Sequence, residues 1–341
     1  MTTTRRLRTG LAATAVVLVA VTAACGATDV PESLPGPTST TTEVPAPPPD
    51  AQDPTCTNRT AEREGSVVRS LRPDAAAERA LATGQFPAGS YMQAIRDRGR
   101  LRVGVDTSTN LFSSVDPRTG EFLGFDADMA REMARALLGS PDLVEFVAIP
   151  YSRRVDILAQ QPEPGVDMVI DTFTINCVRD DSIDFSSEYF TSTQKLLVRV
   201  DDPADSIDDF GGRPVCAAAN STSIENLAAL PDPTPIPVAV TDQADCLVLL
   251  QQGQVDAIST DDTILAGMVA QDPNTRIAGD PFSAEPYGIG LPPNRPEYVR
   301  FVNAALEEVR TSGRWAELYA EWLSVLPSET GGQPPVAQYE D

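Results

Sequence analysis

The chain contains no histidine, and this absence excludes several kinds of catalytic and metal site. Ser-His-Asp and Cys-His nucleophilic catalysis both require an imidazole, as does every histidine-ligated metal centre. The five cysteines show no CxxC spacing, so four thiolates on a zinc ion are only a weak alternative to disulfides. We therefore expect no cofactor and no metal ion.

Positive charge is also scarce. The chain has 26 lysine and arginine residues and 49 aspartate and glutamate residues, which gives a formal net charge of −23 at pH 7. Three of the arginines, Arg5, Arg6 and Arg8, precede the predicted cleavage point, so the processed chain would be more acidic still. Such a surface repels nucleic acid and anionic lipid, and we expect no nucleic acid partner.

The N-terminus has no apolar run long enough for a comfortable membrane span, which needs about 20 residues. A shorter run over residues 11–21 follows the three arginines, and small residues precede Cys25. This layout is typical of a lipoprotein export signal, although Thr22 stands where a branched apolar residue is usual. We predict that residues 1–24 are removed and that lipidated Cys25 anchors the exported chain to the outer face of the cytoplasmic membrane. A plain cleaved signal and an uncleaved anchor are the alternatives.

Four further cysteines, Cys56, Cys177, Cys216 and Cys246, make an even number in an exported protein. This indicates two disulfides, for which three pairings are possible. We favour Cys216 with Cys246 inside one lobe, and Cys56 with Cys177.

Residues 25–55 and 327–341 lack the apolar residues that a folded core needs. The first segment is rich in proline, threonine and acidic residues, and we interpret it as an extended tether. At roughly 3 Å per residue, such a tether would hold a folded domain several nanometres above the membrane. The second segment contains glycines and prolines and is predicted to be a flexible tail.

Between these segments, apolar runs that suit buried strands alternate with stretches of helical periodicity. Strands are predicted at 101–105, 144–149, 167–170, 196–200, 214–218, 237–240, 256–260 and 288–291. Helices are predicted at 125–137, 154–160, 245–252, 296–310 and 314–323. This order indicates an α/β fold with two lobes joined by two crossing strands and a ligand cleft between them. We assign 56–190 and 288–326 to lobe 1 and 194–282 to lobe 2, with crossings near 189–193 and 283–287.

The most informative stretch is 167–190, DMVIDTFTINCVRDDSIDFSSEYF. A short buried strand leads into alternating polar residues, Thr172, Thr174 and Asn176, which would line one wall of a cleft. Arg179 follows, and its guanidinium is suited to holding a carboxylate with two parallel hydrogen bonds. The alternative is a surface arginine paired with a neighbouring acid, namely Asp180, Asp181 or Asp184.

Six segments together resemble the family 3 extracellular solute-binding proteins, the polar amino acid receptors of ABC importers. They are GRLRVGVD (99–106), GEFLGFDADMA (120–130), the stretch 167–190, GGRPVCAAANSTS (211–223), GQVDAISTDDTILAG (253–267) and RTSGRWAELYAEW (310–322). The resemblance covers about residues 90–325 and implies the type II periplasmic-binding-protein-like fold. It also implies a non-enzymatic, monomeric receptor for a polar L-amino acid of the glutamate, glutamine, aspartate and asparagine class.

The resemblance also implies roles for individual residues. Arg179, with Thr174 beside it, matches the arginine that holds the α-carboxylate of the ligand. Ser221 and Thr222 match the loop whose backbone N–H groups hold the same carboxylate from the other lobe. Asp261 matches the acid that pairs with the α-ammonium. Two further positions are Thr172, which matches a residue that offers the ammonium its carbonyl, and Tyr151, which matches an aromatic that stacks on the ligand.

Each of these assignments has a structural alternative. Thr222 would cap the helix that follows it, and Tyr151 would belong to the core. Asp261, or its neighbour Asp262, would cap the helix beginning at Thr263.

Ligand specificity depends on two charged residues. Arg154 matches a position at which acidic amino acid receptors place an arginine for the side-chain carboxylate, and Arg153 would serve equally. Asp171 would repel an acidic ligand if it faced the cleft, and would then favour an amide or a cation. A structural ion pair between Asp171 and Arg154 is the alternative.

The leading functional hypothesis is a lipid-anchored receptor that closes around its amino acid and docks on an ABC permease. The alternative keeps the binding step and changes the partner to a transmembrane signalling protein. An enzyme built on the same scaffold is disfavoured, because the chain has no room for an additional catalytic domain.

Overall fold

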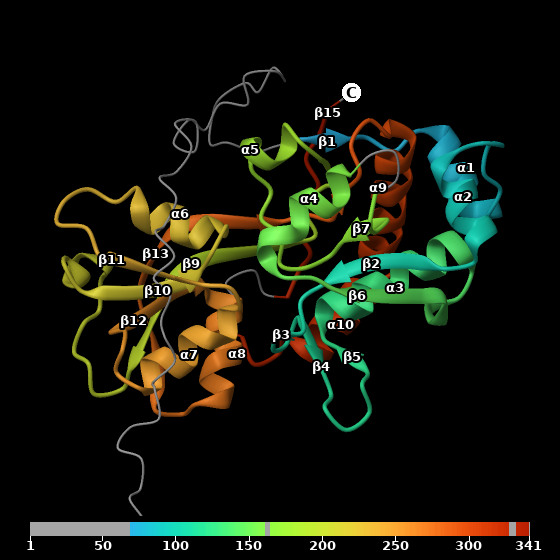
Figure 1. Cartoon of the computed structure of the whole chain (residues 1–341). Coiled ribbons are helices and arrows are strands. Elements are labelled where there is room, and N and C mark those ends of the chain that lie inside the picture. The colour runs from blue at the N-terminus through green and yellow to red at the C-terminus, as the bar shows by residue number, and fades with distance from the viewer. Residues whose placement is uncertain (1–68, 161–163, 327–331, 341) are drawn as a thin grey trace, which may run out of the picture. The chain divides into compact units, whose positions relative to one another are not determined.

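The computed structural model describes residues 69–160, 164–326 and 332–340. The predicted signal peptide, Cys25, most of the segment before the first strand and Cys56 therefore lie outside the described residues. Within the described ranges, no helix is both long and apolar enough to cross a membrane. Two five-stranded sheets dominate this part of the chain, and each has helices packed on it (Figure 1).

Lobe 1 is the part of the chain built on the first sheet, whose central strand is β2 (Leu101–Val105). β2 pairs in parallel with β6 (Val144–Ala148) on one side and with β7 (Met168–Val169) on the other. β14 (Gly290–Leu291) is antiparallel to β7 and to the edge strand β8 (Asp184–Phe185). Parallel strands are covered on both faces, which explains why the sequence of β2 is almost continuously apolar.

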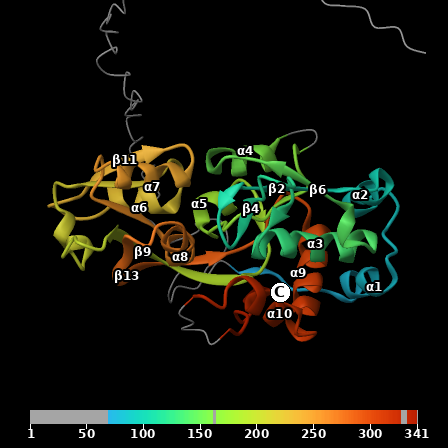
Figure 2. The ribbon, with the colours of Figure 1, turned by 90° about the horizontal axis from the view of Figure 1, so that it is seen from below.

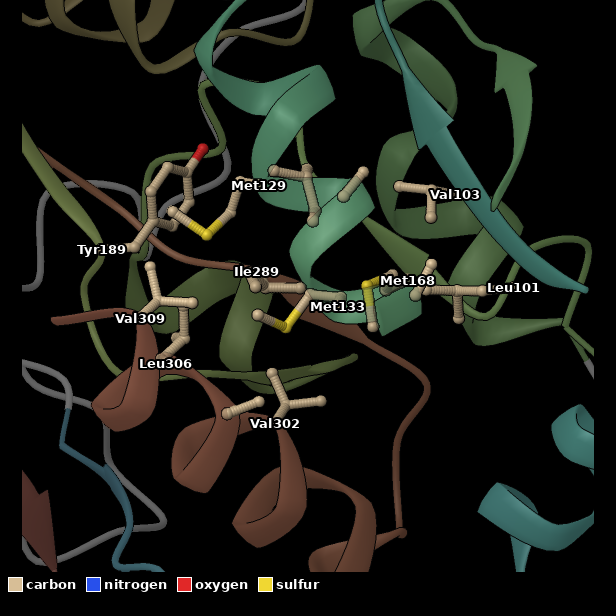
Figure 3. Packing of buried hydrophobic residues seen from close by; sticks show 14 of the residues in the cluster. Leu101, Val103, Met129, Met133, Met168, Tyr189, Ile289, Val302, Leu306 and Val309 are labelled. Carbon is tan, nitrogen blue, oxygen red and sulfur yellow. The ribbon is translucent and has the colours of Figure 1, made fainter. Parts of the chain in front are cut away.

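The helix α3 (Phe125–Leu138) covers this sheet with the face that its sequence periodicity predicts. Met129 and Met133, one helical turn apart, are buried, as are Phe125 and Leu137. Figure 3 shows the two methionines pointing into the same cluster as Leu101 and Met168 from the sheet and Ile289, which precedes β14. Val302 lies across from them on a second helix, so the core of lobe 1 is a layer of apolar side chains between sheet and helices.

The remaining helices of lobe 1 come from the start, middle and end of the chain. They are α1 (Ala75–Thr83), α2 (Tyr91–Arg98), α4 (Arg154–Ala159), α5 (Cys177–Asp180), α9 (Pro296–Thr311) and α10 (Arg314–Trp322), with the 3-10 turns η1 (Pro141–Leu143) and η2 (Tyr151–Arg153). α9 and α10 pack against α3, as Figure 2 shows from below. The chain therefore returns to lobe 1 after completing lobe 2.

Two smaller sheets complete lobe 1. β3 (Ser108–Thr109), β4 (Ser113–Val115) and β5 (Phe122–Leu123) form an antiparallel sheet between β2 and α3 in the sequence. β1 (Ser70–Leu71) pairs in parallel with β15 (Tyr339–Glu340) at the end of the chain. This pairing corrects the prediction of a flexible tail for residues 339–340, because a two-residue strand leaves no detectable pattern in the sequence.

Lobe 2 is the part of the chain built on the second sheet, which has the order β11-β10-β12-β9-β13. β10 (Pro214–Ala218) pairs in parallel with β11 (Ile236–Val240) and with β12 (Ala257–Asp261). The helices of lobe 2 are α6 (Thr222–Ala228), α7 (Gln243–Gln251) and α8 (Asp262–Gln271), with the 3-10 turn η3 (Ile207–Phe210).

The long strands β9 (Phe190–Arg199) and β13 (Thr275–Tyr287) connect the lobes (Figure 1). They pair antiparallel, with Phe190 opposite Tyr287 and Gln194 opposite Ser283. A bridge from Thr174 to Tyr287 joins the lobe 1 end of this ribbon to the site region. The predicted fold class, two α/β lobes joined by two crossing strands, is confirmed.

A disulfide joins Cys216 on β10 to Cys246 on α7, as predicted, with the Cα atoms 5.6 Å apart. Both residues are fully buried inside lobe 2. Cys177 is also disulfide-bonded, and its partner lies outside the described residues, so its pairing with Cys56 stays a prediction.

Replacing both Cys216 and Cys246 with alanine should lower the free energy of unfolding by about 3.5 kcal/mol, because the disulfide closes a long loop in the unfolded chain. The two cysteines are 30 residues apart in sequence. Urea unfolding of the double variant and the wild type would measure the difference. A change below about 1 kcal/mol would contradict the expected role of the disulfide.

Candidate functional site

The predicted site residues lie on both sides of the junction between the lobes. Lobe 1 supplies Tyr151, Arg154, Asp171, Thr172, Thr174 and Arg179, and lobe 2 supplies Ser221, Thr222 and Asp261. The hydroxyl oxygens of Thr174 and Thr222 are 3.5 Å apart, so the two sets meet. A second contact joins the lobes at Ser108, whose Oγ donates to Asp242 Oδ1 at 2.7 Å.

Arg179 is a buried cation without a counter-ion among the described residues. The Asn176 side chain caps α5 by accepting the Arg179 backbone N–H at 2.9 Å, and Arg179 itself is 8% exposed. Nη1 donates to the carbonyl of Thr174 at 2.6 Å, and the guanidinium lies 4.9 Å from the centre of the Phe173 ring. No carboxylate of the described residues lies within ion-pair distance, so a surface pair with a neighbouring acid is not what forms.

Burial lowers the pKa of Arg179 to about 10, and the positive charge of Arg154 acts in the same direction. Both effects disfavour the cation, and the acids Glu225, Glu285 and Asp261 oppose them from a distance. A negative charge placed beside a buried cation of this kind would stabilise it.

Arg154 is buried between two aromatic rings, those of Tyr151 at 4.2 Å and Phe173 at 4.6 Å. Its Nε donates to the carbonyl of Tyr151 at 3.2 Å and its Nη1 to the carbonyl of Asp171 at 3.0 Å. Nη1 also lies 3.9 Å from Asp171 Oδ2, so the ion pair considered above as an alternative does form. Arg153 is exposed, which distinguishes it from Arg154 as a candidate for the site.

Asp171 has no accessible surface, and its two carboxylate oxygens have different surroundings. Oδ1 accepts the backbone N–H of Asp106 at 3.2 Å, whereas Oδ2 is buried without a hydrogen-bond partner among the described residues. Burial raises the pKa of Asp171 well above its ordinary value, Arg154 opposes this, and the charges of Asp106 and Asp126 add to it. The unpartnered oxygen can accept a hydrogen bond from an incoming group.

Thr172 adopts a strained backbone conformation beside Asp171. Its φ of 42° lies in the left-handed region, where β-branched residues are rare. The Thr172 N–H donates to Asp126 Oδ2 at 2.7 Å, which holds this conformation, and the Thr172 hydroxyl is buried without a partner in the described part of the chain. Strain of this kind concentrates at functional sites.

Tyr151 is buried and contributes to the mouth of the site. Its hydroxyl lies 2.8 Å from Thr109 Oγ1. A pocket of about 240 Å³ lies beside it, lined from lobe 1 by Asp106 and Ile149 and from lobe 2 by Asp242. Tyr151 thus packs in the core on one side and borders a space between the lobes on the other.

On lobe 2, Ser221 caps α6 and Thr222 does not. Ser221 Oγ accepts the N–H of Ile224 at 3.2 Å and donates to the carbonyl of Ala218 at 2.7 Å. Because the cap is already provided, the Thr222 hydroxyl turns toward the junction and donates to Glu285 Oε2 at 2.7 Å.

The adjacent acids Asp261 and Asp262 have different environments. Asp262 accepts hydrogen bonds from Ser192 Oγ at 2.6 Å and Thr193 Oγ1 at 2.9 Å, so it fixes the crossing strand β9. Asp261 is 4% exposed and accepts the hydroxyl of Tyr287 at 2.6 Å. Burial raises the pKa of Asp261 well above its ordinary value, and the Glu285 charge adds to the effect. Asp261 makes no capping hydrogen bond with α8.

Two acids of the site were missed by sequence reasoning. Glu285 on β13 accepts hydrogen bonds from Thr174 and Thr222, and Asp126 at the start of α3 accepts the Tyr189 hydroxyl at 2.7 Å. The alternation Ser283, Glu285, Tyr287 on a predicted crossing strand would have indicated the first, because alternate residues of a strand share a face. Asp126 resembles an ordinary acid in the first turn of a helix and gave no signal.

The described residues contain no group of histidine, cysteine and acidic side chains that could hold a metal ion. What the site does contain is a buried cation on lobe 1 and a buried acid on lobe 2, with polar groups around both.

Residues 101–325 match the model of the family described as bacterial extracellular solute-binding proteins, family 3. The chain belongs to this family. Its members are receptors rather than enzymes, and they act outside the cytoplasm. The match covers both lobes and every predicted ligand-binding residue named above.

Comparison with individual relatives of this solute-binding protein agrees. The chain is 33% identical to the ABC transporter glutamine-binding protein GlnH of Bacillus subtilis, over 70% of this chain and 86% of that one. It is 30% identical to the glutamate-binding protein GluB of Corynebacterium glutamicum, over 71% and 84% of the two chains. A solved structure of an ancestral arginine-binding protein bound to arginine is 31% identical, with a TM-score of 0.62 over 67% of this chain and 99% of that one.

The pH dependence of the free energy of unfolding should reveal the burial of Asp126, because burial raises the pKa of its carboxyl group to about 7. The folded state then keeps the proton that the unfolded chain releases near pH 4, so the contribution of this group is complete below about pH 4 and is lost as the pH rises to about 7. The amide introduced by Asp126→Asn cannot ionise. Urea unfolding gives the free energy of unfolding of the variant minus that of the wild type, and this difference should shift by about 2 kcal/mol in favour of the variant between pH 5 and pH 7.5. A difference that is equal at the two pH values would show that Asp126 is ionised in the folded protein throughout.

Proposed function

We propose that this solute-binding protein is an extracytoplasmic receptor that closes its two lobes around one polar L-amino acid and delivers it to an ABC permease. The expected ligand belongs to the glutamate, glutamine, aspartate and asparagine class. The receptor is anchored to the outer face of the cytoplasmic membrane by lipidated Cys25, and the permease is its membrane partner.

One observation carries this proposal. Arg179 on lobe 1 is a buried cation, Asp261 on lobe 2 is a buried acid, and neither has an ion-pair partner among the described residues. The α-carbon of a free amino acid carries a carboxylate and an ammonium, which complement both charges at once. A ligand with only one of these groups leaves the other residue buried and unpaired, which costs affinity.

The side chain of the ligand would lie toward Arg154, Asp171 and Tyr151. Arg154 offers N–H donors, and Asp171 Oδ2, which is ion-paired with Arg154, accepts no hydrogen bond in the described chain. Tyr151 provides an aromatic wall beside the pocket between the lobes. A short polar side chain finds partners here, which supports the amino acid class that the glutamine-binding and glutamate-binding relatives also favour.

Closure follows from the distribution of these contacts. Each lobe contributes a charge and hydroxyl groups, so the ligand gains its full set of contacts only when the lobes meet. The ribbon of β9 and β13 is the connection about which the lobes would turn, and the closed form would then present a defined surface to the permease.

Calorimetric titration of the secreted chain, starting at residue 26, with the twenty L-amino acids tests the proposal. We expect one-to-one binding confined to polar amino acids. Absence of heat across the panel would refute the receptor function.

Arg179→Ala should weaken binding at least a hundredfold, because it removes one partner of a buried charge pair and leaves the ligand carboxylate unpaired. Circular dichroism and the unfolding midpoint would verify that the fold is retained. Retention of wild-type affinity would show that another residue holds the carboxylate.

Arg154→Ala and Arg153→Ala form a matched pair of neighbouring arginines, of which one is buried and the other exposed. Loss of Arg154 should weaken binding roughly tenfold or more by removing its contacts with the ligand side chain, whereas loss of Arg153 should leave affinity within about a factor of two. Equal effects of the two substitutions, measured by the same titration, would argue against a role for Arg154 at the ligand.

A further inference from the structure

Glu285 is a densely hydrogen-bonded acid at the junction of the lobes, and the roles assigned so far do not include it. Its side chain lies on the crossing strand β13 and is 1% exposed. Oε2 accepts the hydroxyl of Thr174 at 2.8 Å and that of Thr222 at 2.7 Å, one from each lobe. Oε1 accepts from Ser283 Oγ and, at 3.3 Å, from Asn226 Nδ2.

These contacts decide what Thr174 and Thr222 can offer a ligand. A threonine hydroxyl has a single hydrogen and two lone pairs. Both hydrogens are directed at Glu285 Oε2, so only the oxygen lone pairs are available to an incoming molecule. The two hydroxyls therefore cannot donate to a carboxylate while Glu285 holds them, and they can accept from an N–H group.

The groups around this cluster also favour a hydrogen-bond donor or a positive charge. The hydroxyl of Tyr287, two residues along β13, donates to Asp261, which places a second carboxylate on the same side of the junction. The negative charge of Glu285 adds to the effect of burial in raising the pKa of Asp261. Arg179, by contrast, directs Nη1 to the carbonyl of Thr174 and has no ion-pair partner in the described chain.

We propose that Glu285 is a specificity-determining residue, which turns Thr174 and Thr222 into hydrogen-bond acceptors and forms with Asp261 an anionic corner for the α-ammonium of the ligand. This inference rests on the proposed amino acid receptor. It assigns the carboxylate of the ligand to Arg179 and the ammonium to the corner. It also explains selection for a free amino group, since a 2-hydroxy acid brings no positive charge to the two acids.

In the opposite role, Glu285 would compete with the carboxylate of the ligand for the hydroxyl hydrogens of Thr174 and Thr222. The ligand carboxylate could then accept these hydrogen bonds only after Glu285 had released them. Neutralising Glu285 then strengthens binding, whereas an ammonium corner makes the same change weaken it. The sign of the effect separates the two roles.

Glu285→Gln is the test, because glutamine has almost the same shape and lacks the charge. The matched control is Glu225→Gln, which removes a partly buried acid on α6 that acts on Arg179 and forms no hydrogen bond with either threonine in the described chain. Titration with the amino acid that the wild type binds should show affinity reduced roughly tenfold or more in Glu285→Gln and changed less than about threefold in the control. Tighter or unchanged binding by Glu285→Gln overturns the proposal.

A second measurement separates an ammonium corner from a purely structural role. Wild type and variants are titrated with the amino acid and with the 2-hydroxy acid of the same carbon skeleton, and the ratio of the two affinities is compared. The ratio should fall roughly tenfold or more in Glu285→Gln, because only the ammonium contact is lost. A purely structural defect weakens both ligands equally, leaves the ratio unchanged and overturns the inference.

Thr222→Val provides a second test of the proposal if the Glu285→Gln variant does not fold. It removes one accepting hydroxyl, preserves the shape of the side chain and leaves the backbone of α6 intact. The ratio should again fall, and an unchanged ratio counts against the corner. A wild type that binds no amino acid refutes the receptor function and this inference together, whereas a wild type that binds while both variants keep its ratio refutes only the inference.

Discussion

The antiparallel pairing of β9 with β13 is the constraint on which the site depends. Both strands belong to the sheet of lobe 2 and connect it along the chain to lobe 1, and their pairing fixes which residues of β13 face the junction. In a strand, alternate residues share a face, so the register that brings Tyr287 opposite Phe190 brings Glu285 and Ser283 to the same side. A slip of one residue would turn Glu285 and Tyr287 away and remove the partners of Thr174, Thr222 and Asp261.

The second physical theme is the burial of ionisable groups at considerable cost. Asp126, Asp171 and Asp261 are almost or completely inaccessible, and burial raises the pKa of each. Stability alone does not select such groups, because well-packed apolar residues would usually serve as well or better. Ionisable groups with perturbed pKa values cluster at functional sites, and these three acids accompany two buried arginines, Arg154 and Arg179.

Much of the architecture could be predicted from local sequence. The strands at 101–105 and 214–218 have the predicted bounds, and the helices at 125–137 and 296–310 differ from the observed ones by one residue. These elements carry strong apolar periodicity, which is a local property. The terminal pairing of β15 with β1 was missed because two residues are too few to show any period.

Only some residues of the candidate site were named from the sequence, and the reason differs from that for the missed strand. Arg179 and Thr174 were named as candidates because they follow a buried strand, where polar side chains indicate a cleft, whereas Asp261 was named from the family resemblance. Glu285 and Asp126 act through partners 111 and 46 residues away in sequence, Thr174 and Thr172. The alternation around Glu285 indicates only which face of the strand it occupies, and its partners, like those of Asp126, depend on how whole lobes pack.

The Cys216–Cys246 disulfide joins a strand and a helix of the same lobe and does not reach the crossing strands. The disulfide therefore braces lobe 2 internally, while the described connections to lobe 1 are the two crossing strands and side-chain contacts such as that of Ser108 with Asp242. The disulfide restrains the interior of lobe 2, and it does not cross-link lobe 2 to lobe 1. In an oxidising environment this disulfide would strengthen the interior of lobe 2 without cross-linking β9 to β13.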